Sequence, residues 1–363
     1  MPLKYGLVGL PNVGKSTLFN ALTHSQVAAA NFPFCTITPN VGTVGVPDER
    51  LQILASLAKP QKVIPTLIEF VDIAGLVKGA SQGEGLGNQF LANIREVDAI
   101  IHVVRCFQDD LVVHVAGQVD PAFDKEIIDD ELRHRDLETI GKRMIKTEKV
   151  AKAGSKGPQQ ELALLKVLQA KLAQGTNARD LDPAQIQLAK SWQLLSLKPV
   201  IYVANIAEST LARGTNPYVA QLQQATSEEH SVVILVCASL EAQMAGLNAA
   251  KRAFFSAPYG VEAEGLAKLV RTSYEQLSLI TYFTAGPQEV RAWTIRRGTK
   301  APQAAGIIHS DFERGFIKAE VIQLADYQYY QTERACREAG KIRIEGKDYV
   351  VADGDIIHFR FNV

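Results

Sequence analysis

The stretch Gly9-Leu10-Pro11-Asn12-Val13-Gly14-Lys15-Ser16 decides the fold of this chain. It matches the pattern GxxxxGK[ST], follows the apolar run KYGLVGL and opens KSTLFNALT, which has the pattern of a helix. In this context the motif is typical of a P-loop, whose backbone N–H groups and helix N-terminus surround a phosphate. We expect Lys15 to reach the β- and γ-phosphates and Ser16 to offer its hydroxyl to Mg²⁺. The alternative, a chance match in a glycine-rich turn, is disfavoured by the flanking strand and helix patterns.

Length and composition indicate a folded chain of two or three domains. The chain has 363 residues, of which 47% are hydrophobic and 21% charged, as in globular proteins. Lys+Arg and Asp+Glu number 39 each, so a general affinity for polyanions is excluded and any contact with RNA must come from local patches. The four cysteines form no CxxC pair, and no apolar stretch approaches the ~18 residues of a membrane span. We therefore expect no zinc site, no membrane contact and a cytoplasmic location.

Apolar runs separated by helical patterns organise most of the chain. LIEFVD, AIIHVVRCF, VIYVAN and VVILVCA are further strand candidates. Buried runs of this kind predict an α/β fold with a mostly parallel sheet covered on both faces. Residues 120–197 interrupt this pattern with apolar residues at helical spacing, and GSKGP at 154–158 divides them into the two arms of a long helical hairpin. The positions expected in the hairpin core are Leu137, Ile140, Met144, Val150, Leu164, Leu165, Leu168 and Leu172.

The C-terminal part has a different pattern. ITYFTA, VRAWTI, KDYVV and DIIHFRF are short alternating segments separated by turn signals such as AGP, EGK and DGD, which is typical of half-buried strands. We expect residues 1–277, interrupted by the 120–197 insertion, to form one domain and residues 278–363 a small α+β domain.

A second nucleotide motif lies in LIEFVDIAG, residues 67–75. Asp72 ends an apolar strand and is expected to reach Mg²⁺ through water, and Gly75 is expected to offer its N–H to the γ-phosphate. Thr36, in NFPFCTITPN, is the expected switch threonine that closes on the metal, with Thr38 as the alternative. Either threonine could instead cap a local turn.

The next residue, Leu76, stands where Ras-like GTPases carry a water-orienting glutamine. Leucine has no hydrogen-bonding atom in its side chain, so either hydrolysis is slow or the function comes from elsewhere. One candidate is a monovalent cation held near the phosphates by Asn12. Another is His114, in QDDLVVHVAGQ, acting as a catalytic residue on a mobile segment; the competing interpretation is a packed histidine.

Asn205-Ile206-Ala207-Glu208 follows the strand candidate VIYVAN, where a GTP-binding protein is expected to carry Asn-Lys-x-Asp. The aspartate of that motif accepts both N–H donors of guanine. Here Ile206 replaces the lysine and Glu208 is one methylene longer than aspartate, whereas Asn205 can still accept from an exocyclic amine. A carboxylate can also accept from guanine, so the residues leave GTP open but favour ATP. The full set of expected nucleotide-binding residues is Asn12, Val13, Gly14, Lys15, Ser16, Thr17, Asn205, Ile206, Glu208 and Ala238.

Two basic segments are candidates for contact with RNA. Residues 142–156 of the hairpin carry six Lys or Arg against the single Glu148, and residues 289–318 carry six against three acids, with Trp293 and Phe316 between them. The alternatives are a solvated helical face and an ordinary sheet surface with core aromatics. These residues alone leave the alternatives open, and the family resemblance below favours contact of both segments with RNA phosphates.

These motifs together resemble the YchF family of Obg-like ATPases within the translation-factor class of P-loop proteins. The resemblance rests on GLPNVGKS, NFPFCTITPN, DIAGLVKGASQGEGLGNQFL, NIAE, EVRAWTIRRGTKAPQAAGIIHSDFERGFIKAEV and AGKIRIEGKDYVVADGDIIHFRFNV, and covers essentially the whole chain. It implies a doubly wound Obg-type G domain with an inserted antiparallel coiled coil and a C-terminal β-grasp-like TGS domain.

The same resemblance implies functional properties. It implies ATP binding in preference to GTP, slow hydrolysis, and association with the ribosome, for which we expect the large subunit. A hydrophobic residue in place of the catalytic glutamine is matched by Leu76, and a P-loop asparagine that holds K⁺ in related proteins is matched by Asn12. The rival interpretations are a GTP-hydrolysing translation factor and an RNA-binding module whose nucleotide is mainly structural. A metabolic P-loop kinase is a third, disfavoured because no arginine-rich lid segment follows the P-loop.

Overall fold

The computed structural model of the chain describes residues 3–24, 40–73, 86–152, 156–211, 213–229, 231–259 and 265–362. The described residues form two compact units. Unit 1 takes those up to 24, 40–43 and 69–266, and unit 2 takes 44–68 and 267 onward. None of the helices in the described ranges has the length and apolar character needed to cross a bilayer.

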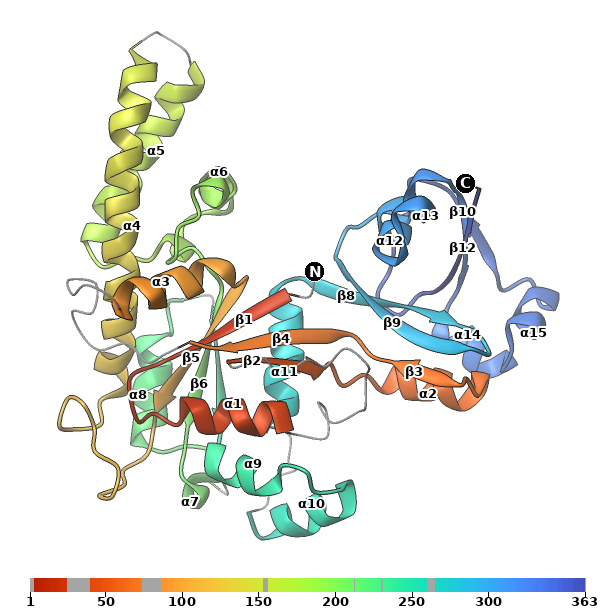
Figure 1. Cartoon of the computed structure of the whole chain (residues 1–363), viewed down its shortest axis with the longest axis horizontal. Helices are drawn as coiled ribbons and strands as arrows, with labels where there is room; N and C mark the ends of the chain where they lie inside the picture. Colours follow the sequence, from red (N-terminus) through yellow and green to blue (C-terminus); the bar gives the residue numbers. More distant parts are fainter. Residues whose placement is uncertain are drawn as a thin grey trace. The chain divides into compact units, whose positions relative to one another are not determined.

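A six-stranded sheet with the order β2-β4-β1-β5-β6-β7 runs through unit 1 (Figure 1). The strands are β1 Leu3–Val8, β2 Val41–Gly45, β4 Leu67–Asp72, β5 Ala99–Arg105, β6 Val200–Asn205 and β7 Val232–Val236. β1 pairs with β5, β5 with β6 and β6 with β7, all in parallel. Every residue of β5 and β6 is buried, so both faces of the sheet are covered. The prediction of a mostly parallel, doubly covered sheet is confirmed, and β2 is a strand that it did not include.

Helices connect and cover these strands. They are α1 Lys15–His24, α3 Leu86–Glu96, α4 Pro121–Ala151, α5 Lys156–Ala173, α6 Pro183–Ala189, α7 Glu208–Leu211, α8 Pro217–Ala225, α9 Ala238–Met244 and α10 Ala249–Ser256, with short 3₁₀ turns at Ala178–Asp180, Lys190–Trp192 and Ala257–Tyr259. Several begin at a side-chain cap followed by proline, as in α4, where Asp120 accepts from the Phe123 N–H. Such caps satisfy the free N–H groups of the first turn.

The expected hairpin is formed by α4 and α5, which pack along one another (Figure 1). The predicted core positions on α5, together with Ile140, are buried, and Leu137 and Met144 pack against them. Val150 differs from the prediction because its side chain is 55% exposed near the end of α4. Asp136 joins the hairpin to the segment before β6, because its carboxylate accepts from the N–H groups of Leu195 and Ser196, each at 2.8 Å.

Unit 2 is built on a second six-stranded sheet with the order β11-β10-β12-β8-β9-β3. Its strands are β3 Lys62–Ile64, β8 Leu279–Ala285, β9 Glu289–Arg296, β10 Phe316–Ile322, β11 Arg343–Glu345 and β12 Ile356–Phe361. Its helices are α2 Glu49–Ala58, α12 Ala301–Ile308, α13 Ser310–Arg314, α14 Leu324–Tyr330 and α15 Glu333–Glu338, and α11 Gly265–Gln276 leads into it from unit 1. KDYVV contributes only the isolated bridge Lys300↔Val350 rather than a strand.

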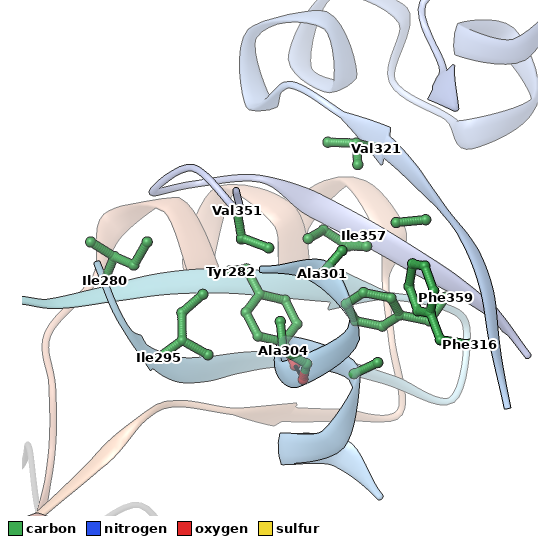
Figure 2. Packing of buried hydrophobic residues seen from close by; sticks show 12 residues of the cluster. Ile280, Tyr282, Ile295, Ala301, Ala304, Phe316, Val321, Val351, Ile357 and Phe359 are labelled. Carbon is green, nitrogen blue, oxygen red and sulfur yellow. Dashed lines mark hydrogen bonds between the residues drawn. The ribbon is translucent and has the colours of Figure 1, made fainter. Parts of the chain in front are cut away.

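Apolar side chains fill both faces of this sheet. On one face Tyr282 meets Phe359 edge-on and packs with Ala301 and Ala304 of α12 (Figure 2). The Tyr282 ring also stacks over Trp293. On the other face Leu51 and Leu54 of α2 pack with Phe283 and Val290.

Residues 44–68 therefore belong to the C-terminal unit, although the sequence boundary at 277 groups them with the first domain. The physical reason is pairing at long range. β3 adds in parallel to the edge strand β9, with Lys62 opposite Glu289, and α2 completes the core beneath it.

Candidate nucleotide-binding site

The loop between β1 and α1 has the backbone of a phosphate-binding turn. Asn12 (φ 63°) and Gly14 (φ 91°) adopt left-handed conformations before α1 begins at Lys15. A Cβ added at Gly14 would lie 2.2 Å from Asn205 Nδ2, and one at Gly9 would lie 2.6 Å from the Val103 carbonyl oxygen. Close approach of neighbouring groups therefore excludes a side chain at both glycines, and the positive φ adds to the requirement at Gly14.

Lys15 and Ser16 converge on Asp72 at the carboxyl edge of the sheet, where open α/β folds bind their ligands. The Lys15 ammonium forms an ion pair with Asp72 Oδ1, and Ser16 Oγ donates to Asp72 Oδ2 at 3.1 Å. Mg²⁺ is typically bound through one or two carboxylates together with phosphate oxygens and water. The adjacent hydroxyl and carboxylate therefore fit the expected magnesium site. No group of three or more His, Cys, Asp or Glu suited to a metal occurs in the described ranges.

Asn205 braces the P-loop from the end of β6. Its Nδ2 donates to the Val13 carbonyl oxygen at 2.8 Å, and its Oδ1 accepts from the Ala238 N–H at 3.1 Å. Only 5% of Asn205 is exposed. One buried side chain thus joins the P-loop, β6 and the first residue of α9, which brings together three segments that the sequence predicted to be nucleotide-binding.

Glu208 begins α7, and both oxygens of its carboxylate are engaged by other side chains. The Tyr259 hydroxyl donates to Oε2 at 3.0 Å, and Gln243 Nε2 donates to Oε1 at 3.4 Å. The hydrogen bond to Glu208 raises the pKa of Tyr259. Ile206 is 2% exposed and its N–H donates to the Val236 carbonyl, so its side chain belongs to the core.

His114 lies in the loop between β5 and α4, with both ring nitrogens engaged. Its Nε2 bonds with Asp124 Oδ2 at 2.9 Å, and its Nδ1 accepts from the Ala116 N–H at 3.2 Å. Because Nδ1 is an acceptor, the proton is assigned to Nε2, which donates to the carboxylate. The side chain is buried, and burial raises the pKa of Asp124.

The same loop touches the P-loop. Asn12 Nδ2 donates to the Val113 carbonyl at 3.1 Å. The buried Arg105, at the end of β5, fixes the first part of the loop by donating to the carbonyl oxygens of Phe107, Asp109 and Val112. Leu111 and Val113 nevertheless remain 95% and 75% exposed.

Comparison with known proteins identifies the family of this chain. Curated relatives named "Ribosome-binding ATPase YchF" are 52% identical in Escherichia coli O157:H7, 51% in Haemophilus ducreyi and 51% in Bacillus subtilis, in each case over 100% of both chains. The chain belongs to the YchF family. A solved structure described as the Schizosaccharomyces pombe YchF GTPase is 40% identical, with a TM-score of 0.89 over 99% of this chain and 97% of that one.

Two family models divide this YchF chain. Residues 4–148 match a model described as "50S ribosome-binding GTPase". Residues 279–362 match the YchF C-terminal model, described as a protein of unknown function. The expected fold is confirmed. The descriptions name ATPase for the bacterial relatives and GTPase for the yeast structure, so they leave the choice of base to the site itself.

Several predicted site residues lie outside the described residues of this YchF chain. They are Thr36, Thr38, Gly75 and Leu76. Thr17 is described and exposed beside Ser16 in the first turn of α1.

Sequence patterns missed three residues of the site. Tyr259 and Gln243 contact Glu208, and the Val113 carbonyl contacts Asn12. None belongs to a motif at fixed spacing, because α9 and the turn after α10 reach Glu208 only through the fold. Only Val113 could have been suspected from the sequence, because it precedes the candidate residue His114.

Proposed function

We propose that this YchF-family chain is a Mg²⁺-dependent nucleotide hydrolase that prefers ATP to GTP and acts as a nucleotide-gated switch on the ribosome in the cytoplasm. The single observation that carries the base preference is the engagement of Glu208. Reading guanine with a carboxylate uses two acceptor oxygens together, and here Tyr259 and Gln243 already donate to them. Each oxygen keeps a second lone pair, but these two donors fix the position of the carboxylate, so reading guanine would require Glu208 to turn from the position in which they hold it.

Asn205 supports binding without selecting the base. One N–H of its amide donates to Val13, and its oxygen accepts from Ala238. The second N–H can donate to a ring nitrogen that adenine and guanine share. Discrimination therefore depends on Glu208 and its surroundings rather than on Asn205.

The phosphate side of the site supports hydrolysis in the manner of P-loop proteins. Lys15 would exchange Asp72 for the β- and γ-phosphates, while Ser16 and Asp72 would hold Mg²⁺, which when bound neutralises charge on the phosphate oxygens. Gly75 keeps its proposed role at the γ-phosphate and Thr36 its role at the metal. We expect slow turnover, because Leu76 cannot orient water and because His114 is engaged with Asp124.

K⁺ remains part of the proposal through Asn12. Its Nδ2 donates to Val113, and none of the described residues donates to its Oδ1, the atom that a cation would require. His114 can take a catalytic role only if it leaves Asp124 and Ala116.

Phosphate release tests the hydrolase. The wild-type chain should release phosphate from ATP faster than from GTP at equal subsaturating concentrations, with Mg²⁺ present. Lys15→Ala should abolish phosphate release from both nucleotides. Lys59→Ala, which changes an exposed lysine of unit 2, should leave both rates unchanged. Equal rates for wild type and Lys15→Ala would assign the activity to a contaminant and remove the proposal.

Contact with the ribosome is proposed to involve the outer part of α4. Lys142, Lys146, Lys149 and Lys152 are exposed, and none of them forms an ion pair within the described chain. Ile145 lies among them and is 61% exposed. The relatives' name and the description of the N-terminal family model support a ribosomal partner, the latter naming the 50S subunit.

The C-terminal basic segment supports binding to RNA less strongly. Lys300 pairs with Asp348, Arg314 with Asp311 and Lys318 with Glu320. Phe316 is a core residue. The described hairpin therefore offers the better candidate surface for RNA phosphates.

Sedimentation with ribosomes tests the switch. Changing the four exposed hairpin lysines to glutamate should reduce cosedimentation. The slope of the logarithm of the binding constant against the logarithm of the salt concentration should become less steep by about 0.7 to 0.9 for each phosphate that is no longer neutralised. The matched control changes Lys59, Lys62, Lys251 and Lys347, which are exposed elsewhere. Binding should also differ between ADP and a non-hydrolysable ATP analogue, and the difference should vanish in Lys15→Ala. A Lys15→Ala chain that binds ribosomes as wild type does in every nucleotide state would favour a module with a structural nucleotide.

A further inference from the structure

The sheet of unit 2 opens between two of its central strands. β8 and β12 pair in parallel at a single position, Ile356 opposite Phe283. Beyond it the β8–β9 hairpin and the β10–β12 pair run in different directions (Figure 1). Two parallel strands of six or seven residues would ordinarily continue their ladder. The opening therefore leaves backbone groups of both strands without ladder partners among the described residues.

Hydrogen bonds around the opening identify these groups on β8. The Phe283 N–H donates to the Asp355 carbonyl at 2.8 Å, and the Thr281 carbonyl accepts from the Gly354 N–H at 2.7 Å. Alternate residues of a strand direct their backbone groups to the same side. Ala285 therefore directs its N–H and C=O toward β12, where no described residue pairs with them.

The corresponding groups on β12 follow from its pairing with β10. The Asn362 N–H donates to the Gly315 carbonyl at 2.9 Å, and β12 pairs with β10 along its length. The backbone N–H and C=O groups of the even-numbered residues of β12 thus point toward β10. The backbone N–H and C=O groups of the odd-numbered residues Ile357, Phe359 and Phe361 point toward the opening. Apart from the single pair with Phe283, these groups have no ladder partner in the described chain.

A cavity of about 610 Å³ occupies this opening. We call it the β8–β12 groove. Aromatic side chains line it on both sides, and Phe361 is 38% exposed, stacked on Phe312 at 3.8 Å between ring centroids. The lining aromatic residues are Trp293, Phe312, Tyr327, Phe359 and Phe361.

Among its described lining residues, the groove offers one carboxylate without an ion pair. Glu289, Glu320 and Glu333 line it, whereas no Lys or Arg is among its described lining residues. Glu320 is paired with Arg360 and Arg337, and Glu333 with Arg337. Glu289, at the start of β9, forms no ion pair within the described chain. The guanidinium of Arg291 lies 4.0 Å from the centroid of the Trp293 ring, so the unpaired carboxylate of Glu289 is the group that attracts lysine or arginine and repels phosphate.

We propose that the β8–β12 groove binds an extended peptide segment of a partner protein, in which lysine or arginine alternates with β-branched or aromatic residues. The segment forms main-chain hydrogen bonds with the free edge of β12, in the manner of strand addition. Its apolar side chains pack on the aromatic lining, and a basic side chain reaches Glu289. This goes beyond the proposed nucleotide switch and does not depend on it.

The test uses the full chain and a labelled octapeptide that alternates valine with lysine or arginine. Three companion probes isolate each element of recognition: the same peptide with glutamate for every basic residue, the same peptide with alternate backbone nitrogens methylated, and an oligouridine of equal length. Affinity is measured by fluorescence anisotropy, and the binding position by shifts of the Ala285, Phe359 and Phe361 amide resonances. Glu289→Lys is the test variant, and Glu338→Lys, at the exposed end of α15, is the matched control.

The basic peptide should bind and shift the three amide resonances. Glu289→Lys should weaken it about tenfold, as expected for loss and reversal of a close charge pair, while Glu338→Lys should not. The acidic and methylated peptides should bind more weakly than the basic one. Equal affinity for acidic and basic peptides, absence of binding, or binding that leaves these three resonances unshifted would overturn the proposal. Oligouridine shifting the same amides would assign the groove to RNA and also overturn it.

Discussion

The hydroxyl of Tyr259 donates to Oε2 of Glu208 at 3.0 Å, so the carboxylate that we propose to govern base selection is held by the protein itself. Tyr259 ends the turn after α10, and Glu208 begins α7. In our proposal, a residue far along the chain thereby limits which acceptors the nucleotide base meets. Because Tyr259 and Gln243 donate to this carboxylate, we propose that Glu208 does not perform the task of the aspartate in Asn-Lys-x-Asp.

Removing this hydroxyl should change base preference. Tyr259→Phe leaves the Glu208 carboxylate with only the longer hydrogen bond from Gln243 to Oε1, so the carboxylate is held less firmly and its Oε2 becomes available to an N–H donor of guanine. We expect the ratio of GTP to ATP affinity to rise about three- to tenfold, equivalent to one hydrogen bond of roughly 1 kcal/mol. Competition against a fluorescent nucleotide measures the ratio. Tyr218→Phe, on α8, is the control, and an unchanged ratio in Tyr259→Phe would show that Tyr259 does not restrain base choice.

Asn205→Ala should weaken both nucleotides together. It leaves the buried Val13 carbonyl and Ala238 N–H without their partner, at roughly 1 to 3 kcal/mol for each unsatisfied group. The P-loop loses its brace, so ATP and GTP affinity should fall about tenfold or more, with their ratio unchanged. Asn216 is a matched control because it also joins separate segments, donating to Cys106 and capping α8. Asn216→Ala should lower thermal stability but leave affinity unchanged; a selective loss of ATP in Asn205→Ala would instead make Asn205 a base-selecting residue.

His114 and Asp124 should be coupled in stability. His114→Ala leaves the buried Asp124 carboxylate without its donor, and the Asp124 Oδ1 atom already lacks a partner in the described structure. We expect a loss of roughly 1 to 3 kcal/mol in unfolding free energy. A double-mutant cycle with Asp124→Ala should show a coupling of roughly 0.5 to 3 kcal/mol. Additive losses in denaturant titrations would mean that the pair contributes nothing to holding the loop.

Unit 2 should lose stability in acid through Glu320. Hydrogen bonds from Arg360 and Arg337 lower the pKa of Glu320 from 4.5 to about 2. A depressed carboxyl pKa stabilises the folded state above the unfolded-state value, and this contribution disappears as the pH falls from 4.5 through about 2.

Urea unfolding across that pH range tests the assignment. Trp192→Phe leaves Trp293 as the sole tryptophan of the chain, so its fluorescence reports on unit 2. In this background Glu320→Gln should flatten the loss of unfolding free energy below pH 4.5, whereas Glu338→Gln should not. An unchanged pH dependence in Glu320→Gln would contradict the assignment.

Local patterns predicted much of this molecule, and long-range pairing accounts for most of what they missed. The P-loop and the strands β1, β4, β5, β6 and β7 were predictable from the sequence. Each depends on neighbouring residues, which form a glycine turn, a helix start or a buried apolar run. The assignment of residues 44–68 to unit 2 was not, because it depends on Lys62 meeting Glu289 across the chain. Val150 fits the helical period of α4, but it lies near the end of that helix and its side chain is exposed. Tyr259 carried no signal, since only the folded chain brings it to Glu208.

The most direct test of the central claim is titration calorimetry of ATP and of GTP into the unmodified chain, with Mg²⁺ and K⁺ present. We predict tighter binding of ATP, because Glu208 is engaged by Tyr259 and Gln243. Equal or tighter binding of GTP would contradict this claim, and would mean that Glu208 reads guanine in spite of its bonds to Tyr259 and Gln243.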